Sequence, residues 1–339
     1  MKANQYFPSI GRFGAKWYPE DIVGGSYMND TGNYWFVDGD KSASGSGTSW
    51  EDAFYDFESA CNNTSLTAGD TIFVAARTMA ATSTDPVSYT ENATLDTPSV
   101  SVIGVSRGRT QGGLPQFKVG ATTTSPVVDI KAPGCLIYNI GINGVGGTGG
   151  GIRLYDDGGT TAAAFGTSIM GCHFKNCVVT ANNGATGGAI YTTSAGGPWQ
   201  LYIGGNRFYK NEADIVSVGT GGSVPQDWVI EGNVFSGPAA NVDVNIYTSS
   251  GGVNGIIIKD NVFTAMPALS AGSVKRYVDL TGSVGIMVNN YFASIVSPTG
   301  SEGTFAAAGS LAKVPATVFI SSCWGETTTT AETGEIFRT

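Results

Sequence analysis

Acidic residues near predicted strands are the side chains of this sequence best suited to chemistry. Glu212 and Asp214 stand two residues apart before a predicted strand, so both are expected on one face, and Asp243 has a similar place one repeat later. Carboxylates about 5–10 Å apart can act as acid and base in glycoside hydrolysis. If the chain is an enzyme, these three are its candidate catalytic residues, and otherwise they are solvated loop residues. Four other acids are weaker candidates: Asp156, Asp157, Glu231 and Asp260.

Histidine and cysteine residues come close together once. The single histidine, His173, lies between Cys172 and Phe174, and Cys177 follows four residues later. One histidine and two cysteines at this spacing do not match a zinc site. Alternation along a strand places Cys172 inward and His173 on the surface. The five cysteines are an odd number without a CxxC pair, which favours free, buried thiols over a disulfide framework.

Patterns for calcium and for sugar stacking are weak. Asp38, Asp40 and Ser42 loosely resemble a calcium loop, but position 43 carries alanine where such a loop needs glycine. Trp199 and Trp228 lie near Gly-rich loops and could stack on sugar rings, with packing inside or along the fold as the competing interpretation. The sequence therefore predicts no metal and no cofactor.

A repeated unit must position these residues. A phrase ending in phenylalanine occurs five times, at spacings of 34, 27, 28 and 29 residues, and each copy has an aliphatic residue or methionine five positions earlier. The units hold short β-rich runs and no sustained helical period. Several short strands per ~30 residues, stacked about 4.8 Å apart, make a parallel β-helix with the phenylalanines inside and asparagines at an inward bend. The two columns are Phe174, Phe208, Phe235, Phe263 and Phe292, and Asn206, Asn233, Asn261 and Asn290.

The start of the repeat region resembles a known superfamily. The stretch from Tyr34 to Cys61 is followed by LTAGDTIFVAA, from Leu66 to Ala76, and then by VSVIGVSRG. This order resembles the opening of right-handed β-helix proteins typified by pectin and pectate lyases and by many phage tailspikes. The resemblance implies an all-β fold, a right-handed parallel β-helix solenoid. It also implies that a lyase of this kind would use an arginine or lysine near acidic residues.

Two flanking segments complete one elongated domain. Residues 1–33 are an aromatic-rich arm that anchors the chain or caps the solenoid, 34–295 are the β-helix, and 296–339 are a last strand and a Thr-rich tail. Thr48 with Glu51 three residues later has the form of a capping box, which predicts an N-terminal capping helix over about 49–61. Such a helix would cover the exposed edge of the first coil.

Composition excludes some partners. The net charge is −9, and the 18 lysines and arginines form no basic patch, so nucleic acid is not an expected partner. No apolar run is long enough to cross a membrane, and the first thirty residues hold no signal peptide. We expect a protein made in a host cytoplasm and carried in a virion.

These observations predict a non-enzymatic structural protein of a bacteriophage particle, a decoration protein or spike. The expected assembly is a homotrimer that contacts shell or tail proteins through residues 1–33, with a host surface glycan as a further partner. The alternative is a polysaccharide-degrading β-helix enzyme, a tailspike depolymerase of hydrolase or lyase type, with Glu212, Asp214 and Asp243 as its acids. A glycan-binding adhesin is a third interpretation.

Overall fold

A computed structural model describes most of the solenoid. Most of the predicted arm at 1–33 and most of the predicted tail at 296–339 lie outside the described residues. None of the helices in the described part of the chain has the length and apolar character that a membrane crossing requires. The described ranges are 32–79, 87–106, 113–120, 124–157, 163–179, 187–193, 195–218, 224–236, 244–248, 251–264, 276–292, 312–326 and 333–335.

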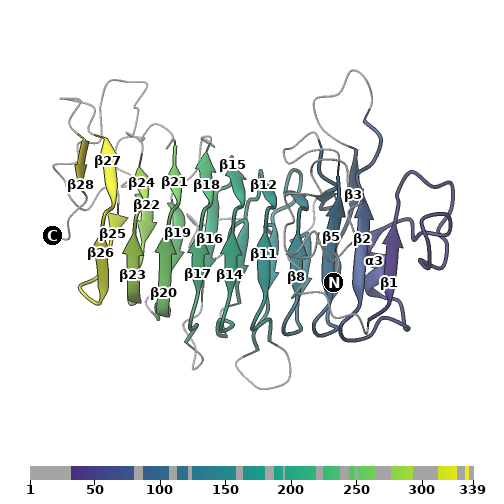
Figure 1. Cartoon of the computed structure of the whole chain (residues 1–339), viewed down its shortest axis with the longest axis horizontal. Coiled ribbons are helices and arrows are strands. Elements are labelled where there is room, and N and C mark those ends of the chain that lie inside the picture. The colour runs from purple at the N-terminus through teal and green to yellow at the C-terminus, as the bar shows by residue number, and fades with distance from the viewer. Residues whose placement is uncertain are drawn as a thin grey trace, which may run out of the picture.

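Three long sheets run along the molecule, each built from one short strand per coil (Figure 1). Sheet A contains β1 (Tyr34–Val37), β2 (Thr71–Ala75), β5 (Ser101–Val105), β8 (Leu136–Tyr138), β11 (Ser168–Met170), β14 (Tyr202–Gly204), β17 (Val229–Glu231), β20 (Asn254–Lys259), β23 (Val284–Val288) and β26 (Val318–Ser321). Sheet B contains β3 (Ser88–Thr90), β6 (Gln116–Lys118), β9 (Gly141–Asn143), β12 (His173–Lys175), β15 (Arg207–Tyr209), β18 (Val234–Ser236), β21 (Val262–Phe263), β24 (Tyr291–Phe292), β27 (Trp324–Glu326) and β28 (Thr333–Glu335). Sheet C contains β4 (Ala93–Leu95), β7 (Val128–Ile130), β10 (Ile152–Leu154), β13 (Ile190–Thr192), β16 (Ala213–Ser217), β19 (Val244–Thr248), β22 (Arg276–Asp279) and β25 (Ala312–Lys313).

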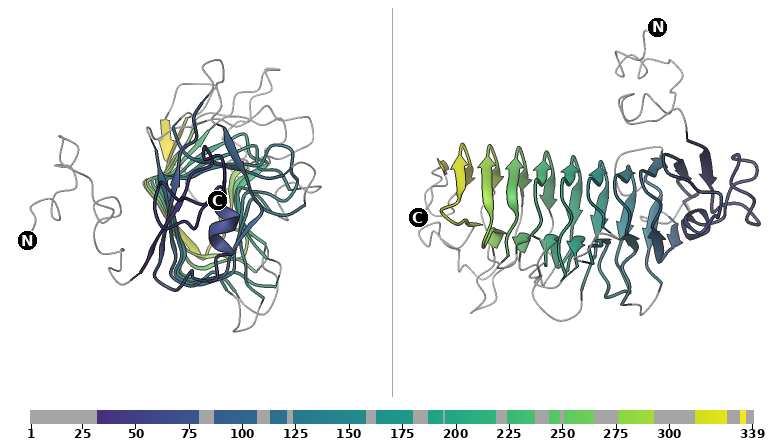
Figure 2. Two further views of the ribbon diagram at one scale, coloured as in Figure 1. Left: turned by 90° about the vertical axis from the view of Figure 1, so that its right-hand side faces the viewer. Right: turned by 90° about the horizontal axis from the view of Figure 1, so that it is seen from below.

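Apart from the strands at the two ends of the sheets, each strand pairs in parallel with the strand one coil before it and the strand one coil after it. The register keeps like residues opposite each other, as where Phe174 faces Phe208 and Ile169 faces Ile203. Seen along the axis, the coils superpose around a common interior (Figure 2). Only β27 and β28 pair antiparallel among the described strands. The prediction of an all-β, right-handed parallel β-helix is confirmed.

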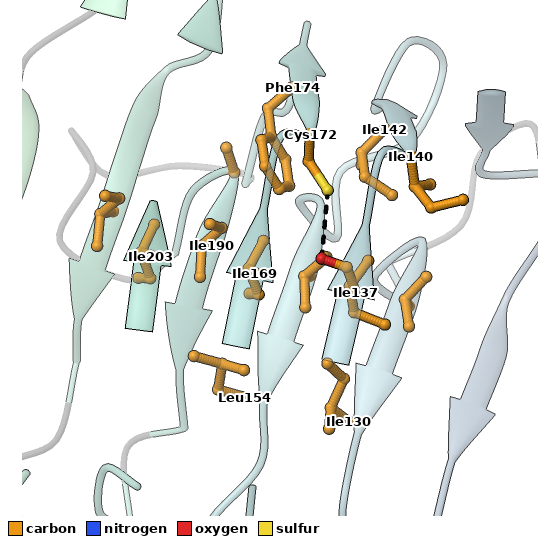
Figure 3. Packing of buried hydrophobic residues seen from close by; sticks show 14 of the residues in the cluster. Ile130, Ile137, Ile140, Ile142, Leu154, Ile169, Cys172, Phe174, Ile190 and Ile203 are labelled. Carbon is orange, nitrogen blue, oxygen red and sulfur yellow. Dashed lines mark hydrogen bonds between the residues drawn. The ribbon is translucent and has the colours of Figure 1, made fainter. Parts of the chain in front are cut away.

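The interior is a stack of like side chains. The five repeat phenylalanines lie ring over ring, with centroids 4.6–5.0 Å apart and planes within 11° of parallel. Beside them, Ile137, Ile169 and Ile203 come from neighbouring strands of sheet A and point into the same core (Figure 3). The strands are short and the fold has a single continuous interior, so most of the hydrophobic stabilisation comes from these columns.

The asparagine column forms the predicted ladder at the bend between sheets A and B. The amide oxygen of Asn233 accepts hydrogen bonds from the backbone N–H and the side-chain Nδ2 of Asn206, at 2.9 and 3.1 Å. Its own Nδ2 donates to the carbonyl of Ile203 and to Oδ1 of Asn261, both at 3.0 Å. The ladder thereby satisfies buried backbone groups that the bend leaves outside the sheets.

The N-terminal helix is shorter than predicted. Helix α3 spans Phe57–Cys61, and its N-cap is Asp56, whose Oδ1 accepts from the Ser59 N–H at 2.7 Å. The prediction of a helix from 49 with Thr48 as its N-cap is wrong. The backbone there is held in an extended loop, since Gly45 and Gly47 donate to the carbonyls of 53 and 52. Those bonds compete with helical ones.

Candidate functional site

The predicted carboxylate cluster does not form. Asp214 is buried in the interior at the corner between sheets B and C, where Asn211 and Asn245 donate to its two oxygens at 2.8 and 2.6 Å. Burial raises the pKa of Asp214 to about 7. An enclosed carboxyl group with two amide donors serves the packing of the coil, because no substrate can reach it.

Glu212 takes a different direction from Asp214. It is half-buried, and its Oε2 accepts from the backbone N–H of Val179 in the preceding coil at 3.0 Å. The expectation that residues two apart share a face is wrong here. Glu212 belongs to the corner between two sheets, where the alternation of a flat strand does not hold. Asp243, the third member of the predicted set, lies outside the described residues.

The four weaker candidate acids are not gathered at one place: Asp156 is buried, and the other three reach the surface. Glu231 lies on the outer face of sheet A, where Lys259 is 2.6 Å from its Oε2 and the Tyr202 hydroxyl donates to its Oε1 at 2.5 Å. The Lys259 ammonium holds the pKa of Glu231 below its usual value. Asp260 accepts from Asn289 at the neighbouring corner. Asp156 is buried and its neighbour Asp157 is exposed.

His173 and its cysteine neighbours point to opposite sides of sheet B. Cys172 and Cys177 point into the core, and the Cys172 thiol donates to the Ile137 carbonyl (Figure 3). His173 faces outward from sheet B as predicted, but it is only 5% exposed, so its predicted surface position is wrong. Burial, with the charges of Lys175 and Arg207, lowers the pKa of His173 to about 4. Within the described ranges no three metal-ligating side chains gather.

The two tryptophans separate into a core residue and a surface residue. Trp228 is buried and its indole N–H donates to the carbonyl of Pro198 at 2.7 Å. Trp199 is 49% exposed at the corner that precedes sheet A. Asp40, from the weak calcium pattern, pairs with Arg77 at 3.2 Å.

The outer face of sheet C holds a charged cluster that sequence reasoning did not find. Asp129 on β7 and Arg153 on β10 are opposite each other in adjacent coils. The guanidinium binds the carboxylate in a fork, with Nε to Oδ1 at 2.8 Å and Nη2 to Oδ2 at 2.6 Å. This two-bond contact fixes the orientation of the arginine. It also raises the pKa of Arg153 above its ordinary value.

A lysine and two tyrosines complete this arginine–aspartate cluster, which we define as Asp129, Lys131, Arg153, Tyr155 and Tyr191. The Lys131 ammonium is 3.4 Å from Asp129 and 5.3 Å from the centre of the Tyr155 ring. Arg153 is 5.8 Å from the same ring. Tyr191, opposite Arg153 on β13, donates from its hydroxyl to the carbonyl of Gly149 at 2.7 Å. The cluster therefore carries two cations, one carboxylate and an aromatic surface.

This arrangement suits an acidic sugar better than hydrolysis by paired acids. A glycosidase uses two carboxylates on either side of the bond it breaks, whereas the cluster brings together one, and that one is held by Arg153. Two half-exposed cations beside a tyrosine ring can bind a carboxylated sugar through its charge and its flat face.

A sequence signal for the cluster existed. Asp129 and Arg153 are each the central, outward residue of a short apolar run, VDI and IRL, and they are 24 residues apart. A charged residue in the middle of such a run is costly unless it is paired. The sequence thus offered a basis for predicting that Asp129 and Arg153, about one coil apart, pair with each other.

Comparisons with known proteins concern the fold. No family model matches the chain, and no curated protein matches it. Among solved structures, pectin methylesterase from Aspergillus niger is similar at 14% identity and a TM-score of 0.43, covering 88% of this chain and 86% of that one. Alginate lyase from Paenibacillus has 12% identity and a TM-score of 0.35, covering 78% and 95%. A lacto-N-biosidase from Eubacterium ramulus has 11% identity and a TM-score of 0.32, covering 85% and 68%.

One prediction is corrected by these structures. The chain was predicted to be non-enzymatic, whereas the similar structures are those of an esterase, a lyase and a glycosidase, so that prediction is wrong. The similarity extends to the fold alone.

Proposed function

We propose that the chain is a polysaccharide-degrading β-helix enzyme that acts on an acidic glycan at the arginine–aspartate cluster. The observation that carries the proposal is the pair of half-exposed cations, Arg153 and Lys131, that converge on Asp129 beside the Tyr155 ring. The cluster lies on the outer face of sheet C, where the side chains of Lys131 and Arg153 are 36% and 32% exposed.

Lyase chemistry fits the charges of the cluster. In a β-elimination, a base removes the proton on the carbon next to the sugar carboxylate, and the electron pair left behind forms a carbon–carbon double bond. The bond from the neighbouring carbon to the glycosidic oxygen breaks, and that oxygen takes up a proton from water. Negative charge builds up on the carboxylate as the proton is lost. Arg153 and Lys131 would stabilise that charge, and Asp129 holds Arg153 in the orientation to do so.

The test is an assay on a panel of acidic and neutral polysaccharides. We expect acidic chains such as polygalacturonate or alginate to yield unsaturated ends, read by ultraviolet absorbance, and neutral glucans to yield none. Lys131→Gln should lower the rate at least about tenfold without lowering thermal stability. Lys259→Gln, which removes a cation paired with Glu231 on sheet A, is the matched control and should leave the rate unchanged.

Two results would contradict the proposal. One is cleavage of neutral chains only. The other is a Lys131→Gln rate equal to that of the unchanged protein.

Placement on a bacteriophage particle, as a homotrimer anchored through residues 1–33, is a second part of the proposal. It is supported by the aromatic residues of that segment, such as Tyr6, Phe7 and Trp17, which are the kind that bury large areas at interfaces. Sedimentation of nuclease-treated lysate from cells that make the protein in its native context tests it. A few copies per particle would support a spike, whereas a wholly soluble chain would contradict this placement.

A further inference from the structure

Two exposed aromatic residues lie at the corner of the solenoid that leads from sheet C into sheet A. The residue before the first of them, Ala164, donates to the carbonyl of Tyr155 in the neighbouring arginine–aspartate cluster. Phe165 and Trp199 are 46% and 49% exposed, and they immediately precede the residues that lead into β11 and β14. Their carbonyls accept from Gly134 and Gly166, each one coil earlier, at 2.8 Å. The two residues therefore occupy the same corner position in successive coils.

A groove of about 220 Å³ lies beside this corner on the outer face of sheet A. It runs across β5, β8 and β11, which are adjacent strands (Figure 1). The volume is smaller than the roughly 300–1,000 Å³ of a pocket that encloses a whole drug-sized ligand, so it suits part of a longer chain. Its lining residues are Gly69, Ser99, Ser101, Gly134, Cys135, Leu136, Gly166, Ser168 and Met170.

The groove has a definite end. Gly134 and Gly166 occupy the corner with positive φ values of 70° and 67°, a conformation that glycine adopts at low cost. In the next coil the same corner position is Gln200, with φ of 58° and an exposed side chain. The groove over the corner glycines therefore ends at the side chain of Gln200, next to Trp199.

The lining is polar without being charged. No Asp, Glu, Lys or Arg is among the residues that line the groove. Ser101 is only 9% exposed, and in the described part of the structure its hydroxyl, like those of Ser99 and Ser168, has no hydrogen-bond partner. These hydroxyls face the groove, where they can bond to water or exchange that water for the hydroxyls of a ligand. Leu136 and Met170 supply the apolar part of the surface.

We propose that this groove and the Phe165–Trp199 corner bind an uncharged stretch of glycan as a second, non-catalytic site. Sugar rings present C–H groups on their faces, which pack on aromatic rings, and hydroxyls at their edges, which hydrogen-bond to serine hydroxyls. A charged ligand would lack a counter-charge here, and an apolar peptide would leave the serines unpaired. The inference rests on the proposed function only in taking the ligand to be a glycan.

The test measures binding separately from cleavage. The Lys131→Gln protein, expected to cleave at least about tenfold more slowly, is titrated with oligosaccharides of neutral glycans, and the heat of binding is recorded by calorimetry. We expect saturable binding that Trp199→Ala and Phe165→Ala each weaken about tenfold in dissociation constant. Ser168→Phe, which fills the groove, should abolish it. Phe319→Ala, at an exposed position on β26 of the same sheet, is the control and should bind normally.

The outcomes of the two proposals are distinguishable. If no neutral glycan binds, or if Trp199→Ala and Ser168→Phe bind as well as the control, the groove proposal is overturned, whatever the cleavage assay shows. If cleavage is never detected but binding depends on Trp199 and Ser168, the groove proposal is supported and the activity proposal fails.

Discussion

The inner corner between sheets A and B and the outer face of sheet C differ in how their residues vary from coil to coil. At the corner, asparagine recurs in coil after coil, from Asn206 to Asn290. Along the outer row of sheet C, successive coils present Thr94, Asp129, Arg153 and Tyr191. A column that repeats meets a need that every coil shares, here the pairing of buried backbone groups. Outward residues that differ from coil to coil meet no need common to all coils. Such residues can instead form a binding site at one position along the solenoid.

The phenylalanine stack should show the largest effect on stability. Phe235→Ala removes a ring that lies 4.9 Å from Phe208 and 4.6 Å from Phe263, and leaves a cavity in the core. We expect the free energy of unfolding to fall by about 4 kcal/mol. Phe319→Ala, 61% exposed, should cost under about 1 kcal/mol. Urea unfolding of both variants checks this. Equal losses of unfolding free energy would contradict the difference between the buried phenylalanine stack and the exposed Phe319.

The asparagine ladder should come next. Asn233→Ala removes the acceptor of the Asn206 N–H and the donor to the Ile203 carbonyl, both buried. Each unpaired group costs about 1–3 kcal/mol, so a total loss of about 3 kcal/mol is expected. Asn254→Ala, at an exposed strand start, is the control and should be nearly neutral. A small loss of unfolding free energy in Asn233→Ala would show that water takes over the hydrogen bonds of the missing amide.

The buried carboxyls predict a dependence of stability on pH. Burial raises the pKa of Asp214 to about 7 and that of Glu91 to about 8, the latter although two backbone N–H groups donate to it. Acids with raised pKa values keep their protons in the folded state, so their stabilisation is full below about pH 4 and is lost as pH rises to about 8. Between pH 5 and pH 8 the contribution of Asp214 should fall by about 3 kcal/mol.

Asp214→Asn isolates that contribution. The variant should lose less stability than the unchanged protein between pH 5 and pH 8, measured by urea unfolding. If both chains lose the same amount, the pKa of Asp214 is not raised in the folded state.

The smallest effect on stability is expected at the outer face of sheet C. Lys131→Gln removes one half-exposed cation that is 3.4 Å from Asp129, and such surface pairs contribute about 0–1 kcal/mol. The melting temperature should therefore stay within a few degrees of the original. A large destabilisation would indicate that the cluster supports the fold and would weaken the case for a binding site.

The sequence predicted what repeats and missed what does not. The phenylalanine and asparagine columns could be predicted because five copies of the first and four of the second align, and the structure places both inside. The helix was misplaced because Thr48 and Glu51 make a locally good cap, while backbone bonds from Gly45 and Gly47 hold that segment in a loop. The local capping pattern does not show that these backbone N–H groups would take the carbonyls of residues 52 and 53.

The candidate site could not be derived in the same way. Asp129 and Arg153 meet because β7 and β10 pair in a particular register, and the variable lengths of the coils conceal that register. Glu212 and Asp214 were read as one face because they are two apart, but a corner separates them. Distances across coils depend on where each corner lies, and the repeat spacing alone does not give that.

The coil-by-coil pairing also bears on how such a chain changes in evolution. Every parallel strand bonds only to its two neighbours along the axis, so a duplicated coil would present the same edges as the coil that it copies. The molecule could lengthen or shorten by whole turns wherever the change separates neither β7 from β10 nor the groove strands β5, β8 and β11 from one another. Its length and its chemistry can thus be inherited separately, the first by copying turns and the second by exchanging outward residues within them.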